Sequence, residues 1–154
     1  MEWKLKTFEE LTNKELYEIL KAREEIFIIE QTCIYPDIDS KDFTAYHLFS
    51  EENGILTSYL RILPKGIRFK EISFGRVITK ENYRRKGLGL ELMKKALHFT
   101  NTVLKEQSVR ISAQAYLLDF YGSLGFKPVS ELYLEDGIDH YEMLFTASKD
   151  TFLT

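Results

Sequence analysis

Apolar and polar positions along this chain follow two different periods. Near the start, Trp3 and Leu5 alternate with charged residues, which is the period-two pattern of a half-exposed strand. Behind Thr12 and Glu15, which form a capping-box pattern, apolar residues recur every three or four positions and predict a helix. Similar patterns predict seven strands, over residues 2–7, 45–50, 55–63, 71–79, 109–115, 129–134 and 141–146. They predict three helices, over residues 13–30, from about 87 onwards, and around 117–124.

Turn signals separate these segments. Residues 52–54 and 135–137 each end in glycine and mark hairpins, while the aspartate-rich segment 33–42 is predicted to be a loop. Gly125 stands where a left-handed cap would end the short helix. Helices interleaved with many strands predict a mixed α/β (α+β) fold in which helices cover the faces of a sheet. A length of 154 residues, with no repeat or linker, predicts a single domain over residues 1–154.

Composition narrows the class of protein. Hydrophobic residues make up 44% of the chain, but no run of about 18 apolar residues could span a membrane. Cys33 is the single cysteine, so no intrachain disulfide can form, and we expect a cytoplasmic protein. A net charge of −3 argues against general nucleic-acid binding, which needs a basic face. The three scattered histidines show no metal-ligand spacing.

One basic, glycine-containing turn precedes the second long helix. Its sequence is Arg84-Arg85-Lys86-Gly87-Leu88-Gly89. The first N–H groups of a helix lack partners, and glycines let a ligand approach the backbone, so the turn suits a diphosphate. A P-loop pattern is absent, and Leu92 stands where a dinucleotide fingerprint requires glycine. A solvated basic surface without a ligand is the alternative interpretation.

A second motif follows the strand over residues 109–115, and its sequence over residues 114–126 is QAYLLDFYGSLGF. With the basic turn it resembles the GNAT superfamily of N-acyltransferases. The first family motif, [QR]-x-x-G-x-[GA], is matched by Arg84, Gly87 and Gly89. The second, roughly N-x-x-A-x-x-[FL]-Y-x-x-x-G-F, is matched by Phe120, Tyr121, Gly125 and Phe126. Gln114 and Leu117 depart from that pattern, although glutamine still supplies an amide.

Further segments are similar to the ElaA-like branch of this superfamily, so that the resemblance covers nearly the whole chain. They are residues 27–31, 35–39, 75–78, 113–115 and 135–140. The resemblance implies a mostly antiparallel central sheet of about six to seven strands, with helices on both faces, splayed at the cofactor site. It also implies acetyl-CoA as co-substrate, without a metal.

The resemblance assigns roles along the cofactor. The backbone of residues 77–79 would pair with the pantetheine arm, and the amides of the basic turn would hold the diphosphate. The implied cofactor-binding residues are Val77, Ile78, Thr79, Arg84, Arg85, Lys86, Gly87, Leu88, Gly89, Gln114 and Tyr121.

Direct acyl transfer needs a neutral amine, a donor for the oxyanion and a proton for the departing thiolate. Tyr121 is the predicted acid, and a backbone N–H of the central strand is the predicted oxyanion donor. Glu30 and His140 are the candidates for a general base. Arg76 is expected either to pair with Glu30 or to contact the acceptor.

Two acidic segments are implied near the acceptor side, where an acidic mouth would attract a cationic amine. They contribute Asp37, Asp39, Asp42, Glu131, Glu135, Asp136 and Asp139. The expected partner is a small-molecule or peptide amine, with no nucleic acid or membrane, and the expected state is a monomer or homodimer. A module that senses acyl-CoA without catalysis is the alternative from another class.

Overall fold

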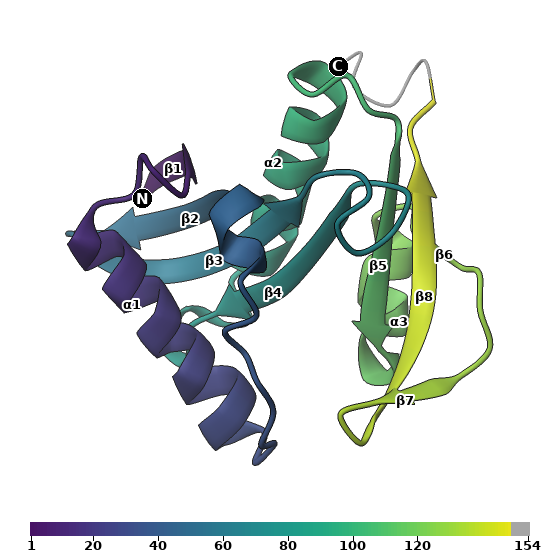
Figure 1. Ribbon diagram of the computed structural model, residues 1–154, viewed down its shortest axis with the longest axis horizontal. Coiled ribbons are helices and arrows are strands. Elements are labelled where there is room, and N and C mark those ends of the chain that lie inside the picture. Colours follow the sequence, from purple (N-terminus) through teal and green to yellow (C-terminus); the bar gives the residue numbers. More distant parts are fainter. Residues whose placement is uncertain (149–154) are drawn as a thin grey trace.

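The computed structural model describes residues 1–148, whose strands form two four-stranded sheets (Figure 1). The first sheet has the antiparallel order β1-β2-β3-β4, built from Glu2–Thr7, Tyr46–Glu52, Ile55–Leu63 and Ser73–Thr79. The second has the order β5-β8-β6, with β7 also paired to β8. Its strands are Ser108–Gln114 (β5), Lys127–Pro128 (β6), Tyr133–Glu135 (β7) and Ile138–Thr146 (β8).

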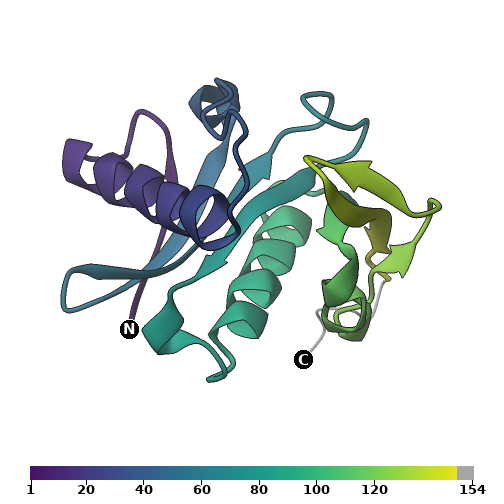
Figure 2. The same cartoon turned by 90° about the horizontal axis from the view of Figure 1, so that it is seen from below.

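The helices are α1 (Asn13–Arg23), α2 (Leu88–Thr102) and α3 (Leu118–Ser123), with a π-helical segment η1 (Glu24–Glu30) continuing α1. Short 3-10 turns are η2 (Lys41–Thr44), η3 (Glu81–Tyr83) and η4 (Ala115–Leu117). α1 lies on one face of the first sheet and α2 on the other (Figures 1 and 2). Within residues 1–148, no helix has the length and apolar character needed to cross a membrane.

The first helix begins at the predicted capping box. The Thr12 hydroxyl accepts from the N–H of Glu15 at 3.1 Å, and the Glu15 carboxylate accepts from the N–H of Thr12 at 2.9 Å. The α-helix ends at Arg23, however, and not at Glu30 as predicted. The following π-helical turns carry more residues each, so side chains there depart from the 3.6-residue period on which the prediction rested.

The strand predicted over residues 129–134 is also wrong. β6 ends before that segment and β7 covers only its last two residues, while β8 begins at Ile138 rather than at residue 141. Pro128 has no N–H to continue a ladder, and the Ser130 hydroxyl takes the place of a backbone partner by accepting from Glu142 N at 2.9 Å. The predicted hairpin before β8 is confirmed, because Asp136 and Gly137 both have positive φ, of 51° and 76°.

The two sheets are joined at one end only. A parallel bridge links Ile72 to Val109, where the N–H of Arg110 donates to the carbonyl of Ile72 at 2.9 Å. Beyond this bridge, β4 and β5 diverge. No strand among residues 1–148 pairs with the edge of β4 that faces away from β3. The mostly antiparallel, splayed sheet that the resemblance implied is therefore confirmed, with eight strands in the described residues rather than six to seven.

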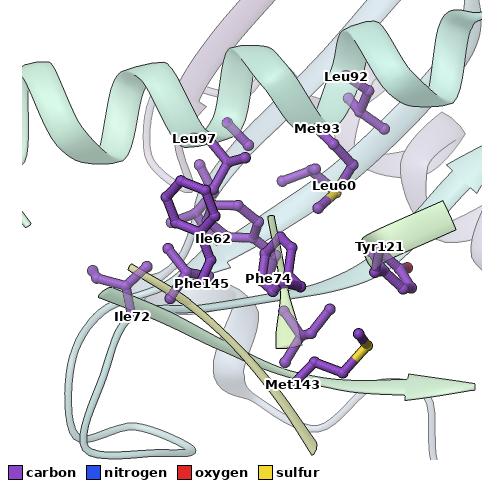
Figure 3. Close-up of a cluster of buried hydrophobic side chains, with 14 of the residues drawn as sticks. Leu60, Ile62, Ile72, Phe74, Leu92, Met93, Leu97, Tyr121, Met143 and Phe145 are labelled. Atoms are coloured by element: carbon purple, nitrogen blue, oxygen red, sulfur yellow. The ribbon is translucent and has the colours of Figure 1, made fainter. Parts of the chain in front are cut away.

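A hydrophobic core under α2 holds the splayed sheets together at the closed end. Figure 3 shows Leu92, Met93 and Leu97 of α2 pointing toward Phe74 of β4 and Phe145 of β8. Burying each such side chain contributes roughly 1.5–3 kcal/mol. A second, smaller cluster lies between α1 and the other face of the first sheet, and contains Ile19, Ala22, Phe49, Leu56, Tyr59 and Ile78.

The cap that ends α3 gives a test of this packing. Gly125 has the predicted positive φ, of 103°, and a Cβ there would lie 3.2 Å from the Phe145 ring. We expect Gly125→Ala to lower the free energy of unfolding by at least about 1 kcal/mol. Gly122→Ala is the matched control, because Gly122 is helical with open space around it, and we expect a gain of up to about 1 kcal/mol. Urea unfolding measures the free energy of unfolding of both variants. Equal effects would contradict the role of Gly125 as the helix cap.

Candidate active site

A cavity of about 570 Å³ opens where β4 and β5 diverge, a size typical of small-molecule and cofactor sites. Residues of both sheets, η1, α2 and α3 line it. Every predicted site residue except Lys86 is among them. Those that line the cavity are Glu30, Val77, Ile78, Thr79, Arg84, Arg85, Gly87, Leu88, Gly89, Gln114, Tyr121 and His140. The Lys86 ammonium instead lies over the Tyr83 ring, 5.8 Å from its centroid.

The basic turn presents the open start of α2 to this cavity. Gly87 is the N-cap, with φ of 79° and no side-chain cap, and the first intrahelical bond runs from Glu91 N to Gly87 O at 3.1 Å. The N–H groups of residues 88–90 therefore lack carbonyl partners within the helix. A Cβ on Gly89 would lie 3.4 Å from Thr79 Oγ1, so glycine lets α2 start close against β4.

Arg84 and Glu30 join this turn to the end of η1. The guanidinium donates to both Glu30 carboxylate oxygens, at 2.7 and 3.0 Å, and its Nε donates to Thr79 O at 2.9 Å. The hydrogen bond from Arg84 lowers the pKa of Glu30, which makes that carboxylate a weaker proton acceptor. Of the two predicted candidates for the general base, Glu30 therefore lies at the basic turn and is paired with the Arg84 guanidinium.

A β-bulge interrupts β4 in the wall of the cavity. Tyr59 pairs with Ile78 and Arg61 with Gly75, which leaves two β4 residues opposite one residue of β3. One of the two is Arg76, whose φ of 53° is unusual for a residue other than glycine. The backbone of β4 therefore changes direction at the point where it borders the cavity.

The side chain of Arg76 fixes this strained residue. Its Nε lies 2.7 Å from Asp37 Oδ1, and its Nη2 donates to Asp37 O at 3.1 Å. The Tyr35 ring packs on the guanidinium, 5.4 Å from ring centroid to Cζ. Arg76 therefore pairs with the loop after η1, and the predicted pairing with Glu30 is wrong because Arg84 takes that carboxylate.

Arg76 belongs to a network of three arginines and three aspartates with balanced charge. Arg23 is fully buried and holds Asp37 at 2.9 Å and Asp42 at 2.7 Å. Arg61 holds Asp39 at 2.6 Å and Asp42 at 3.1 Å. The aspartates of this loop therefore do not form the predicted acidic mouth, because arginine side chains neutralise all three.

This network predicts an acid-sensitive stability. Burial alone would raise the pKa of Asp42, but hydrogen bonds and charge from Arg23 and Arg61 outweigh it and lower the pKa. A carboxylate with a lowered pKa stabilises the fold fully above its unfolded value of about 3.9, and this stabilisation is lost as the pH falls below it. We expect Asp42→Asn to lower the free energy of unfolding at pH 7 by about 3 kcal/mol or more.

The difference between this variant and the natural chain should narrow below about pH 4, because Asp42 then binds a proton in the unfolded chain more readily than in the folded one. Glu25→Gln, which removes a charge from an exposed position, is the control and should change stability by less than about 0.5 kcal/mol. Urea unfolding at several pH values measures both. A constant difference across the pH range would contradict the role of Asp42.

Tyr121 belongs to the core cluster (Figure 3) and also lines the cavity. Its ring packs edge-on against Phe120 and Phe126, with centroids 5.2 and 6.0 Å away. Burial raises the pKa of its phenol, which therefore stays protonated far above neutral pH. Within residues 1–148 no group hydrogen-bonds to the hydroxyl, so its proton is available to a ligand.

The opposite wall of the cavity is polar and comes from the second sheet. Gln114 and His140 are register partners on β5 and β8, and Gln114 reaches across the cavity to Gln31 at 3.3 Å. His140 donates from Nδ1 to Ile138 O at 2.7 Å. Arg68 and Ser112 also line this wall, but they lie outside both motifs, so no sequence signal marks them.

Fold and site together define an acyltransferase of the GNAT type, and comparison with known proteins agrees. Residues 8–147 match the family model described as the Acetyltransferase (GNAT) domain, so the chain belongs to this family. It is also similar to the protein ElaA of Escherichia coli K12, with 39% identity over 145 residues that cover 93% of this chain and 95% of ElaA.

Solved structures place the chain in the ElaA-like branch of the family. An acyl-CoA N-acyltransferase from Pseudomonas aeruginosa superposes with a TM-score of 0.89 at 38% identity, covering 94% of this chain and 99% of that protein. Escherichia coli ElaA superposes with a TM-score of 0.88, also at 38% identity, covering 94% and 98%. The sequence resemblance to this branch is thereby confirmed.

Proposed function

We propose that this chain transfers an acetyl group from acetyl-CoA directly to a primary amine. One observation carries the proposal: a single cavity joins the open start of α2, the unpaired edge of β4 and the free hydroxyl of Tyr121. Such a cavity offers anion binding, backbone pairing and a proton donor in sequence along one elongated ligand.

The chain's own groups fit coenzyme A along its length. The N–H groups of residues 88–90 would receive the diphosphate, with Arg85 adding charge. The edge of residues 77–79 would pair with the amide groups of the pantetheine arm as a further strand would. Arg84 would join the phosphate contacts only by releasing Glu30, since that carboxylate now occupies its guanidinium.

Acyl transfer then requires three chemical roles from groups of the protein. A backbone N–H at the β4 bulge would stabilise the negative charge that develops on the carbonyl oxygen. Tyr121 would donate its proton to the departing sulfur, since its phenol is uncharged at neutral pH. His140 would take a proton from the acceptor, because its Nδ1 carries the hydrogen given to Ile138 and leaves Nε2 as an acceptor in the neutral ring.

Coenzyme A binding is the first test. Calorimetry should show association of acetyl-CoA with the natural chain and at least tenfold weaker binding to Gly89→Val. The added atoms would lie against Thr79 and Phe120 and disturb the amides at the start of α2. Thermal unfolding checks that the variant is folded. If the natural chain fails to bind acetyl-CoA at millimolar concentrations, the proposed function is wrong.

Tyr121→Phe tests the acid. Phenylalanine keeps the packing against Phe120 and Phe126 but removes the proton, so kcat at saturating acetyl-CoA should fall about 10²-fold or more. Thiol release with a panel of primary amines measures turnover. Tyr141→Phe, which alters another tyrosine packed against the same core, is the control and should leave kcat unchanged. Equal turnover by Tyr121→Phe and the natural chain would remove Tyr121 from the chemistry.

A further inference from the structure

We propose that the acceptor binds as an ammonium ion between the carboxylate of Glu135 and the imidazole of His140. The inference rests on the proposed function and deepens it, because it names the two side chains that would bind the acceptor amine. Both residues line the same cavity as Tyr121, on the wall that the second sheet supplies.

The environment of His140 determines which ring nitrogen is free. A carbonyl oxygen can only accept, so the contact of 2.7 Å between Nδ1 and Ile138 O places a hydrogen on Nδ1. In the neutral ring, Nε2 then presents a lone pair. The Tyr133 ring stacks on the imidazole, with centroids 6.0 Å apart and planes at 27°, and keeps this orientation.

The two carboxylate oxygens of Glu135 differ in their contacts. Oε1 accepts from Arg68 and from Ser112, the latter at 3.3 Å. Oε2 has only His140 Nε2 beside it among the described residues, at 3.6 Å. With the ring in its neutral form, two proton acceptors face each other there. An N–H donor placed there would satisfy both, and a primary ammonium supplies three such donors.

This arrangement also suits the proton transfer that must precede attack. An alkylamine has a pKa of about 10.4 and arrives protonated. One N–H bond breaks as Nε2–H forms, and the Glu135 carboxylate stabilises the resulting imidazolium. The freed lone pair forms the new N–C bond as the C–S bond breaks. The attacking nitrogen then loses a second proton, and this proton replaces the one that Tyr121 gives to sulfur.

The imidazole resonances of His140 provide a direct readout that does not depend on turnover. The chain has three histidines, and His140→Gln identifies the signals of this one. Titration with butylamine should shift its ring ¹⁵N and ¹H resonances, whereas 1-butanol, which lacks the charge, should not. Signals that stay fixed with butylamine, or that move equally with both compounds, would overturn the proposal. Signals that show a ring already protonated at pH 7.5 would overturn the proposal as well, because the proton on Nε2 would then occupy the position proposed for an N–H of the amine.

Three variants locate the binding group. Glu135→Gln should weaken the response to butylamine about tenfold or more, because a charged hydrogen bond is lost. Glu25→Gln removes the same charge from an exposed position that does not line the cavity and should leave the response nearly unchanged. Arg68→Gln frees Oε1 while keeping the carboxylate, so the response should stay equal or strengthen. If Arg68→Gln weakens it as much as Glu135→Gln does, the ion pair between them is responsible and the proposal is wrong.

This experiment separates the inference from the proposed function. Butylamine binding at His140 without any acetyl-CoA binding in calorimetry would keep the ammonium site and reject acetyl transfer. Acetyl-CoA binding and turnover, with Glu135→Gln and Glu25→Gln showing equal KM for butylamine, would keep the enzyme and reject the site.

Discussion

The structure depends on a sheet that separates after a single bridge. From Ile72 onwards the outer edge of β4 has no strand beside it within residues 1–148, and its backbone groups face a cavity. Unpaired backbone groups need water or a ligand as partners, so this edge is a natural place for an extended molecule with amide groups. The core under α2 keeps the closed end fixed, and side-chain contacts such as that between Gln31 and Gln114 span the open part.

The arginine and aspartate network explains how a strained strand can border that cavity. A residue other than glycine at positive φ costs roughly 1–2 kcal/mol, and the contacts of the Arg76 guanidinium with Asp37 and the Tyr35 ring offset this cost. The same aspartate holds Arg23, the last residue of α1. The π-helical continuation of α1, the loop after it and the β4 bulge thus form one charge-balanced unit. Removing one charge from it would leave others buried without a partner.

Much of the fold could be predicted because its signals are local. The capping box at Thr12, the glycine cap at Gly125 and the hairpin at Gly137 depend on a few neighbouring residues, and all three are confirmed. The π-helical turns after Arg23 and the split of the predicted strand around Ser130 depend on partners far away in sequence. Nothing near Arg76 in the chain indicates that its partner is Asp37 rather than Glu30, since only the folded sheet brings them together.

For the same reason, one part of the site could be predicted better than the other. The two motifs predict residues on the α2 side, since the diphosphate requires a local turn with free amides. The polar wall opposite α2 combines Arg68, Ser112, Glu135 and His140 from a loop and three strands. The resemblance pointed to Glu135 and His140, but no motif or spacing marks the other two. The two ends of the cavity therefore differ in chemistry as well as in origin. Free N–H groups lie at the basic turn, whereas the Oε2 atom of Glu135 lies beside His140 on the other wall, and the Tyr121 hydroxyl lines the same cavity. Under the proposed function, an elongated anion and a cationic amine would bind at opposite ends because each end offers the complementary group, and the acetyl group would pass between them beside Tyr121.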